Sequence, residues 1–401
     1  LEHYYKICNS LPKELLSHVD KSRFFSVEQN SNKNMEDLKM CIVSTVKSQS
    51  HWGENVPISW TKLESALKRL QKGSKTYLFS KLLKIVKKTN DLNINNEEEL
   101  INALTFFHET GVIMFRSEIK NTIILDVQWF VDAFICIIRD KKHMEMKDKS
   151  DITEFDKLNE YGLLSHELLN KLWKNGNFYQ HEKSLVYHMK QLDMLAEVSE
   201  EMWYVPCMNK QMYAREMLKN CNVSSTLCFL FKFLPFVIFH RLIVACINNL
   251  GMKPWTSSEK MCIFHTVTIL RCKDLTHRVL IGICENKERS HAEYPYSIEI
   301  QANVTNPRKI DAQLTSNLKI SICQILTKLA QAFLSCERSF HVGYRCRLEP
   351  FSENPKGHII KEEEISATKF DCSKCLEVHI VDVSSLLGFW EVIIVEILLL
   401  E

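Results

Sequence analysis

The hydrophobic pattern changes its period near Pro206, and this change limits the possible folds more than any other feature of the sequence. Before Pro206, apolar residues recur every three or four positions, as on one face of an α-helix. After it, segments rich in β-branched residues predominate, as at 262–272 and 296–304. A helical region followed by a strand-rich region predicts an α+β chain with more than one hydrophobic core.

Three short helices followed by two strand-like runs are predicted after Trp60. In order, the elements are helices at 61–70, 79–88 and from 97 to about 110, and strands at 112–115 and 122–125. Asn96 is a suitable N-cap for the third helix, and Gly111 is a suitable stop. Three helices and a hairpin predict a winged helix.

The strand-rich half predicts a mixed or antiparallel sheet with a covering helix. The expected elements are strands at 262–272, 278–284, 296–304, 340–348 and 377–383 and a helix at 318–334, while a strand at 202–205 closes the preceding unit at Pro206. The apolar stretch 227–247 is long enough to mimic a membrane span, but it contains Lys232, Pro235 and Arg241. Each charge costs roughly 2.5 to 3.5 kcal/mol at the centre of a bilayer. We therefore expect a buried helix or strand pair broken at Pro235, and no membrane span.

Residues 1–50 predict a helix at 11–19, a strand at 23–27 and an amphipathic helix at 35–48. So few elements cannot bury a core by themselves, so this segment is expected to dock on another domain. Further helices are predicted at 129–138, 165–173 and 184–195, with a charged linker at 141–149. The expected domains are 1–50, 56–206, 207–390 and an apolar tail, 391–401, that we take for a truncation artefact.

Charge and cysteine content exclude several classes of protein. The sequence has 51 Lys and Arg against 49 Asp and Glu, and a formal net charge of +2, so no global field draws it to nucleic acid. Its 15 cysteines are scattered, and several lie in apolar runs, as Cys136 and Cys246 do. Such cysteines are typical of reduced cytoplasmic proteins, and the chain opens without a signal peptide.

Motifs for nucleotide binding or hydrolysis are absent from the sequence. The segment 72–76, KGSKT, does not have the G-x-x-x-x-G-K-[ST] spacing that lets backbone N–H groups surround a phosphate. Residues 286–289 begin like the base-reading N-K-x-D motif but end in Arg289. No G-x-S-x-G elbow presents a nucleophile, and Glu362–Glu364 form a charge run typical of a solvated face. We therefore expect neither catalytic nor cofactor-binding residues in this chain.

Metal binding is the one chemistry that the sequence leaves open. Cys372 and Cys375 form a C-x-x-C pair, His379 follows four positions later, and Cys346 or His358 lies within reach upstream. Tetrahedral zinc takes four such ligands, and a strong signal has two clean pairs. Because only one is present, the sequence predicts cysteines at the rim of a sheet and no metal. The alternative is a zinc-stabilised interaction adaptor that uses Cys372, Cys375, His379 and Cys346.

The winged helix also allows a nucleic-acid-binding protein as an alternative, because such folds place their third helix in the major groove. Here the first turn of that helix is Glu97–Glu99, which would face a polyanion. Basic residues gather instead on the second helix, at Lys81, Lys84, Lys87 and Lys88. A winged helix that contacts protein is the better interpretation.

Five segments of the chain resemble the COR module of Roco proteins. They are VPISWTKLE at 56–64, FHETGV at 107–112, ILDVQWFV at 124–131, WYVP at 203–206 and FLPFVIFHRLIV at 233–244. The resemblance extends from about 56 to 335, and members without a kinase domain are the closer likeness, partly through the tail 372–390.

The resemblance implies an upstream Ras-like GTPase domain called Roc, whose last strand and helix would be residues 1–50. GTP or GDP and Mg would bind there, and this chain would have no cofactor of its own. The resemblance also implies that the first half of COR packs on Roc and that the second half commonly provides a homodimer contact. The pair would couple nucleotide state to conformation and pass it to an unknown signalling partner.

Large side chains supply candidates for these interfaces. The candidates for contact with Roc are Trp60, Asp126, Trp129 and Phe130, and the candidates for a dimer contact are Phe229, Phe231, Phe233 and Phe236. Core packing is the favoured role for the three aromatic residues near Roc, and a helix N-cap is the simplest role for Asp126.

Overall fold

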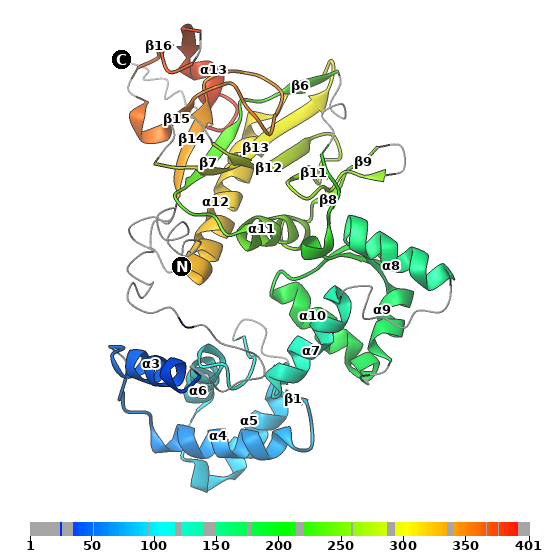
Figure 1. Ribbon diagram of the computed structural model, residues 1–401, viewed down its shortest axis with the longest axis vertical. Helices are drawn as coiled ribbons and strands as arrows, with labels where there is room; N and C mark the ends of the chain where they lie inside the picture. Colours follow the sequence, from blue (N-terminus) through cyan, green and yellow to red (C-terminus); the bar gives the residue numbers. More distant parts are fainter. Residues whose placement is uncertain are drawn as a thin grey trace, which may run out of the picture. The chain divides into compact units, whose positions relative to one another are not determined.

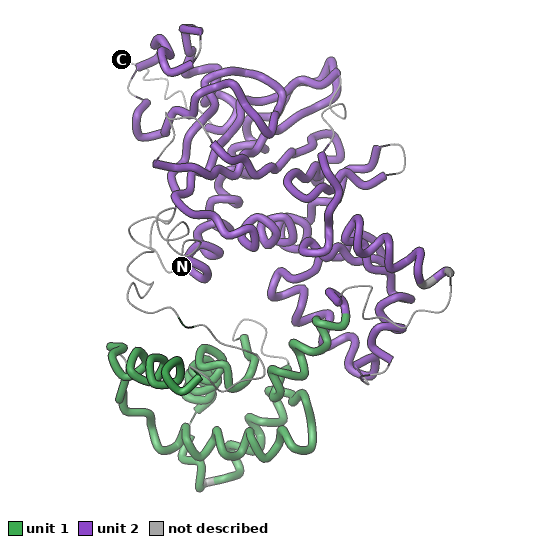
Figure 2. Tube along the Cα trace, viewed as in Figure 1, with its two compact units in different colours: residues 1–136 green, residues 137–401 purple. Residues whose placement is uncertain are grey.

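The computed structural model describes residues 25, 35–50, 52–94, 96–116, 122–139, 149–174, 176, 178–213, 220–257, 260–286, 293–334, 340–365, 367–375 and 377–391. The chain divides into two compact units, 1–136 (unit 1) and 137–401 (unit 2), shown in Figure 2. The predicted helix at 11–19, the strand at 23–27 apart from Phe25, nearly all of the charged linker and the tail beyond Glu391 lie outside the described residues.

Unit 1 contains short helices and one small sheet (Figure 1). The helices are α3 (Met35–Lys47), α4 (Ile58–Gln71), α5 (Phe79–Lys88), α6 (Glu97–Glu109) and α7 (Val127–Ile138), with a 3-10 turn η1 (Asn90–Leu92) and strands β1 (Thr76–Leu78) and β2 (Thr122–Ile124). The predicted helices of this region are confirmed, and Asn96 caps α6 by accepting a hydrogen bond of 2.7 Å from the backbone N–H of Glu99.

The predicted hairpin at 112–115 and 122–125 is only partly present. Strand β2 pairs with β1, which the sequence analysis missed, and the upstream run contributes a single bridge between Met114 and Ile124. Leucines spaced one turn apart on α4 and α6 build the core that holds this sheet, among them Leu63, Leu67 and Leu104.

The first part of unit 2 is a helical layer with a three-stranded sheet. Its elements are α8 (Lys149–Tyr161), β3 (Leu163–Ser165), α9 (His166–Trp173), η3 (Phe178–His181), α10 (Glu182–Gln191), β4 (Ala196–Ser199), β5 (Met202–Tyr204) and η4 (Pro206–Met208), and the strand order is β3-β5-β4. The sequence analysis missed α8, because its only large buried side chains are Phe155 and Leu158 in an otherwise polar segment.

An eight-stranded antiparallel sheet forms the rest of unit 2. It comprises β6 (Cys221–Val223), β7 (Leu227–Phe231), β8 (Lys253–Pro254), β11 (Val267–Arg271), β12 (Arg278–Glu285), β13 (Tyr296–Thr305), β14 (His341–Arg345) and β15 (Ile359–Lys361). The order is β15-β14-β7-β13-β12-β11-β8, and β6 pairs with β13. Every pairing in this sheet is antiparallel. Of the two sheet types expected from the sequence, mixed and antiparallel, the structure has the antiparallel one.

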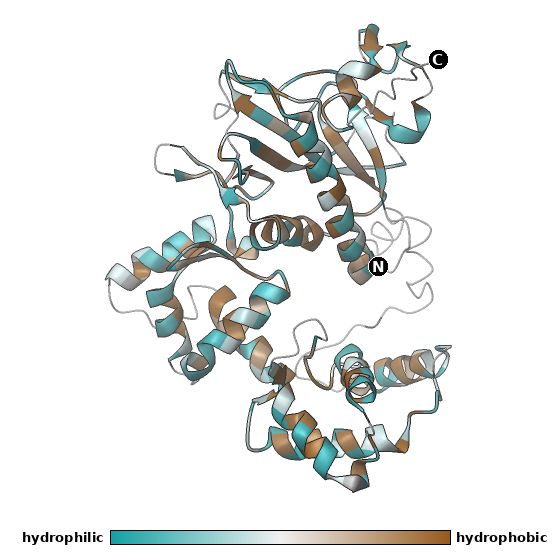
Figure 3. Cartoon of the chain, turned by 180° about the vertical axis from the view of Figure 1, so that it is seen from behind, coloured by the Kyte–Doolittle hydropathy of each residue, from teal (hydrophilic) through white to brown (hydrophobic). Residues whose placement is uncertain are grey.

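Helices α11 (Phe236–Asn248) and α12 (Ala312–Leu334) cover one face of this sheet and pack on each other. The apolar stretch 227–247 is strand β7 followed by α11, with Pro235 at the N-cap between them. Figure 3 shows α11 as hydrophobic over most of its length. Within the described residues, no helix is both long and apolar enough to cross a membrane.

The C-terminal part is a small hairpin and a short helix fastened to the large sheet. The elements are η7 (Glu362–Glu364), β16 (Lys369–Cys372), β17 (His379–Asp382) and α13 (Val383–Leu387), and a second small hairpin joins β9 (Thr256–Ser257) and β10 (Lys260–Met261). Trp390 is fully buried and donates from Nε1 to the carbonyl oxygen of Ser225, at 3.0 Å. The Ser225 hydroxyl donates in turn to the carbonyl oxygen of Leu386, at 2.6 Å.

Candidate functional site

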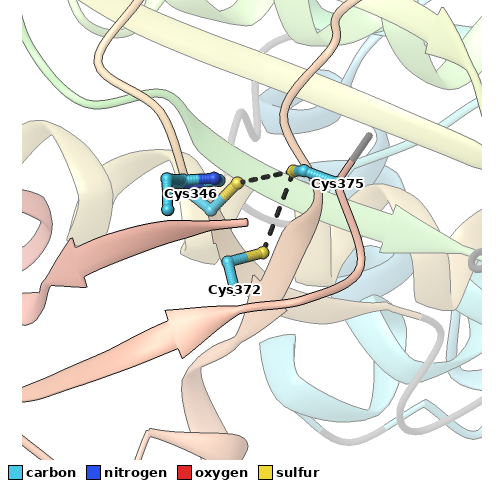
Figure 4. Close-up of side chains that lie close together, drawn as sticks. Cys346, Cys372 and Cys375 are labelled. Atoms are coloured by element: carbon cyan, nitrogen blue, oxygen red, sulfur yellow. Dashed lines mark hydrogen bonds between the residues drawn. The ribbon is translucent and has the colours of Figure 1, made fainter. Parts of the chain in front are cut away.

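Three cysteines, which Figure 4 shows, and one histidine converge from separate elements at the C-terminal hairpin. Cys346 directly follows β14, Cys372 ends β16, Cys375 lies in the turn, and His379 begins β17. Cys372 and His379 are opposite each other in the β16–β17 pairing. We call these four residues the cysteine cluster.

The sulfur atoms of the cysteine cluster lie close together but are not bonded. Cys346 Sγ is 3.4 Å from Cys375 Sγ, and Cys372 Sγ is 3.8 Å from Cys375 Sγ. The candidate ligand atoms of all four residues lie within 4.8 Å of one another. Cys346 and Cys372 are buried, while Cys375 and His379 are half-buried.

The two ring nitrogens of His379 have different surroundings. Nδ1 lies 3.2 Å from the carbonyl oxygen of Glu377, so the neutral tautomer with the proton on Nδ1 donates there. Nε2 is buried and has no hydrogen-bond partner among the described residues. This tautomer leaves the lone pair of the ring on Nε2, the nitrogen without a protein partner among the described residues.

Neighbouring groups favour the thiolate form of Cys375. Burial raises the pKa of this thiol, but hydrogen bonds from the backbone N–H of His358, at 3.3 Å, and from Cys346 and Cys372 outweigh it, with the charge of Arg347. The net pKa of Cys375 is therefore below its ordinary value. Arg347 also donates to the carbonyl oxygen of Glu377, at 3.4 Å, across the same turn.

The sequence analysis named these four residues and offered His358 as an alternative to Cys346. Among the described residues, the group close enough to share one ion contains Cys346 and not His358. Burial and the charges of Lys374 and Arg345 lower the pKa of His358 to about 4. His358 thus contributes its backbone N–H to the cluster, and its ring is neutral at pH 7.

The residues expected to face Roc have unequal exposure. Phe130 is 2% exposed, which fits the core-packing role favoured from the sequence and removes this residue from the candidates for contact with Roc. Trp60 is half-buried, and its ring centroid lies 5.5 Å from that of Phe106. Trp129 is likewise half-buried.

Asp126 caps α7 and pairs with Lys75. Its carboxylate accepts a hydrogen bond of 3.0 Å from the backbone N–H of Trp129 and one of 2.5 Å from Lys75 Nζ. Burial raises the pKa of Asp126, but these donors outweigh it and the net pKa is below the ordinary value. The N-cap role is therefore confirmed, and both carboxylate oxygens are already engaged.

The expected dimer patch is not a surface. Phe229 and Phe231 are fully buried because β7 is an internal strand between β14 and β13. Phe233 is 36% exposed, and the ring of half-buried Phe236 stacks on His265 with centroids 4.8 Å apart. Placing Phe229 and Phe231 at an interface was wrong, because the sequence does not show which strand of a sheet is central.

A buried charged cluster was also missed by the sequence analysis. The Arg345 guanidinium pairs with Glu299 and donates to Asn286 Oδ1, at 2.9 Å, and to the carbonyl oxygen of Gly357, at 2.6 Å. We call these four residues the arginine cluster. No spacing in the sequence marks it, since Arg345 and Glu299 are 46 positions apart.

Comparisons with known proteins agree with the resemblance over part of the chain. Residues 57–213 match the family described as "C-terminal of Roc, COR-A domain". The Dictyostelium discoideum protein named "Probable serine/threonine-protein kinase pats1" is 28% identical over 172 residues, which are 42% of this chain and 5% of that protein.

A solved structure is also similar, titled "Structure of methanosarcina barkeri Roco2 RocCORdC bound to GDP". It has 15% sequence identity and a TM-score of 0.31, and the match covers 44% of this chain and 51% of that chain. The chain thus spans a twentieth of the curated relative and about half of the solved structure. The likeness to Roco proteins is shown over residues 57–213, and this segment belongs to the COR-A family of domains that lie C-terminal to Roc.

Proposed function

We propose that this chain is a non-catalytic regulatory and dimerisation module that couples the nucleotide state of an adjacent Roc GTPase domain to conformation and signalling. The observation that carries the proposal is the match of residues 57–213 to a domain described by its place C-terminal to Roc. In this proposal GTP or GDP and Mg bind to Roc, in cis, and the module shifts between conformations that each nucleotide favours.

The exposed apolar side chains of helix α3 support the proposal that unit 1 binds a partner. None of its 13 residues is buried, although the helix carries Met40, Ile42, Val43 and Val46. Met40 is 63% exposed and Ile42 53%, which is unusual for large apolar side chains on one short helix. Since α3 falls in the segment that resembles the last helix of Roc, the rest of that Roc domain is the partner that we propose for this surface.

We further propose that residues 58–125 form a winged helix that contacts protein. The order α4-β1-α5-α6-β2, with β1 paired to β2, supports it. The first turn of α6 remains acidic, which supports a protein partner over nucleic acid. The alternative, nucleic-acid binding, is favoured by the exposed lysines of α5, and a salt-dependent gel shift with duplex DNA would support that alternative.

Dimerisation is part of the proposal because the resemblance to COR implies a homodimer contact in the second half of the module. Of the four phenylalanines expected at the contact, Phe233 is the most exposed. The cytoplasm is the proposed location, supported by the free thiols of the described cysteines.

The proposal is tested by joining this chain to the Roc domain that we expect upstream of it. Hydrogen exchange is measured on the joined protein with GDP and with a non-hydrolysable GTP analogue. We expect protection in α3 to differ between the two nucleotides, and Ile42→Asp to reduce that difference while Ser44→Asp, on the same exposed helix, leaves it unchanged. Identical exchange with both nucleotides, or GTP turnover by these 401 residues alone, would contradict the proposal.

A further inference from the structure

We propose that Cys346, Cys372, Cys375 and His379 form a structural zinc site. This inference is independent of the proposed function, because it rests on the side chains of the C-terminal hairpin and not on Roc. Three thiolates and one imidazole are the Cys3His donor set of closed zinc sites, in which four protein ligands leave no position for substrate.

The spacing of the sulfur atoms fits a tetrahedral ion. With Zn–S bonds of about 2.3 Å, two ligand sulfurs lie about 3.8 Å apart. The Cys372–Cys375 distance is 3.8 Å and the Cys346–Cys375 distance is 3.4 Å. The remaining pairs of ligand atoms lie within 4.8 Å, so shifts of about an ångström or less would bring all four onto one ion.

His379 is oriented as a zinc ligand is. A ligating histidine usually donates its other ring N–H to a carboxylate, a carbonyl or water, which fixes the ring and its tautomer. Here Nδ1 faces the carbonyl oxygen of Glu377, at 3.2 Å, which leaves the buried Nε2 as the nitrogen that would bind the ion. A buried nitrogen without a hydrogen-bond partner among the described residues is costly unless it is a ligand.

The surroundings offset the charge of the site. Zn²⁺ and three thiolates carry a net charge of −1, and Arg347 reaches across the turn beside Cys375. The backbone N–H of His358 donates to Cys375 Sγ, at 3.3 Å, as N–H groups do around zinc-bound sulfur.

A disulfide explains the cluster less well than zinc does. A disulfide bonds two sulfurs at about 2.05 Å. Cys375 Sγ instead lies 3.4 Å from Cys346 Sγ and 3.8 Å from Cys372 Sγ, so it is similarly close to both and bonded to neither. Any one disulfide would leave a third thiol and His379 Nε2 without a role. Zinc uses all four groups at once.

The site joins two separate sheets of the fold. Cys346 follows a strand of the eight-stranded sheet, while the other three ligands belong to the separate two-stranded hairpin β16–β17. That hairpin is too small to be stable alone. Zinc would therefore fix the hairpin to the end of β14, next to α13 and Trp390.

The test uses the whole 401-residue chain purified under reducing conditions. We expect metal analysis to find about one zinc per chain. Replacement by Co²⁺ should give the intense visible bands of a tetrahedral ion and a thiolate-to-cobalt charge-transfer band. Absence of zinc together with failure of the reduced chain to bind added Zn²⁺ or Co²⁺, or the weak spectrum of six-coordinate Co²⁺, would overturn the proposal.

Matched variants assign the ligands. Cys375→Ser should lower the zinc content from about one to near zero, while Cys207→Ser, an exposed cysteine outside the cluster, should leave it at one. His379→Gln should lose zinc, whereas His379→Cys should keep it and raise the cobalt charge-transfer intensity by about a third, as a fourth thiolate joins. Unchanged zinc in Cys375→Ser, or an unchanged charge-transfer band in a metal-loaded His379→Cys variant, would exclude these ligands.

Discussion

Arg345 and Cys346 are consecutive residues at the end of β14, yet they belong to two polar clusters of different kinds. The arginine cluster is complete within the chain, because the guanidinium meets the Glu299 carboxylate, the Asn286 amide and the Gly357 carbonyl. The cysteine cluster is incomplete, because His379 Nε2 has no protein partner in the described part of the chain. The arginine cluster therefore satisfies its own polar groups, whereas the cysteine cluster has four donor atoms that a metal ion could bind.

The largest effect is expected where the complete cluster is broken. Arg345→Met leaves Glu299, which is 1% exposed, as an unpaired buried charge. Removing one partner of a buried ion pair costs about 3 to 5 kcal/mol in the free energy of unfolding. Urea unfolding followed by tryptophan fluorescence measures this loss.

The double variant Arg345→Met/Glu299→Leu is the control for this prediction. It removes both charges and should recover much of the lost stability, since an apolar pair of similar volume is often neutral. A single variant within 1 kcal/mol of the wild type would mean that the arginine cluster is not complete as described.

Removal of zinc should have the next largest effect. If free zinc stands about 100-fold above its dissociation constant, binding stabilises the folded chain by about 3 kcal/mol, and a chelator removes this amount. Hydrogen exchange should rise in β16 and β17 and stay low in β12 and β13. The same chelator should leave a Cys375→Ser variant unaffected, and an equal response there would contradict the prediction.

His240 is a second half-buried histidine whose Nε2 is buried without a hydrogen-bond partner among the described residues. Burial and the charge of nearby His265 lower its pKa to about 4, so the ring is neutral at pH 7. Its unfolded pKa is about 6.5, so the unfolded chain binds the extra proton first as pH falls. Stability from this group is full above pH 6.5 and declines toward pH 4.

At pH 5 this loss amounts to about 2 kcal/mol relative to pH 7. Urea unfolding of the wild type and of His240→Gln at the two pH values isolates the contribution, because the cysteine cluster titrates in both proteins. The variant should lose about 2 kcal/mol less than the wild type. Equal acid sensitivity would mean that His240 is already charged or solvated in the folded chain.

Features that depend on residues close together in the chain could be predicted from the sequence, whereas contacts between distant segments could not. The amphipathic spacing of 79–88 located α5 to the residue, and Asn96 was correctly named as a cap. Both depend on neighbours within one helical turn. The C-x-x-C pair and His379 were likewise visible as a motif.

Features set by strand order were not visible in the sequence. Phe229 and Phe231 were candidates for a dimer contact, but β7 lies between two other strands and both side chains are buried in the core, while Glu299 gave no sign of its partner on β14. The role of Cys346 depended on where β14 ends relative to a hairpin more than 20 positions away. Antiparallel pairing brings such positions together, and a single sequence does not specify the pairing.

The smallest effect on stability is expected in α3, whose large apolar side chains are exposed. In Ile42→Asp the new carboxylate lies on a side chain that is already 53% exposed, so unfolding of the isolated chain should change by about 0.5 kcal/mol or less. If Roc covers this helix, the same variant should weaken binding to a separately expressed Roc domain by tenfold or more, since it buries an unpaired charge. Isothermal titration measures the affinity, with Ser44→Asp as the control. A large loss of stability in the isolated chain would mean that α3 is covered from within, whereas equal binding by both variants would place the Roc contact elsewhere on unit 1.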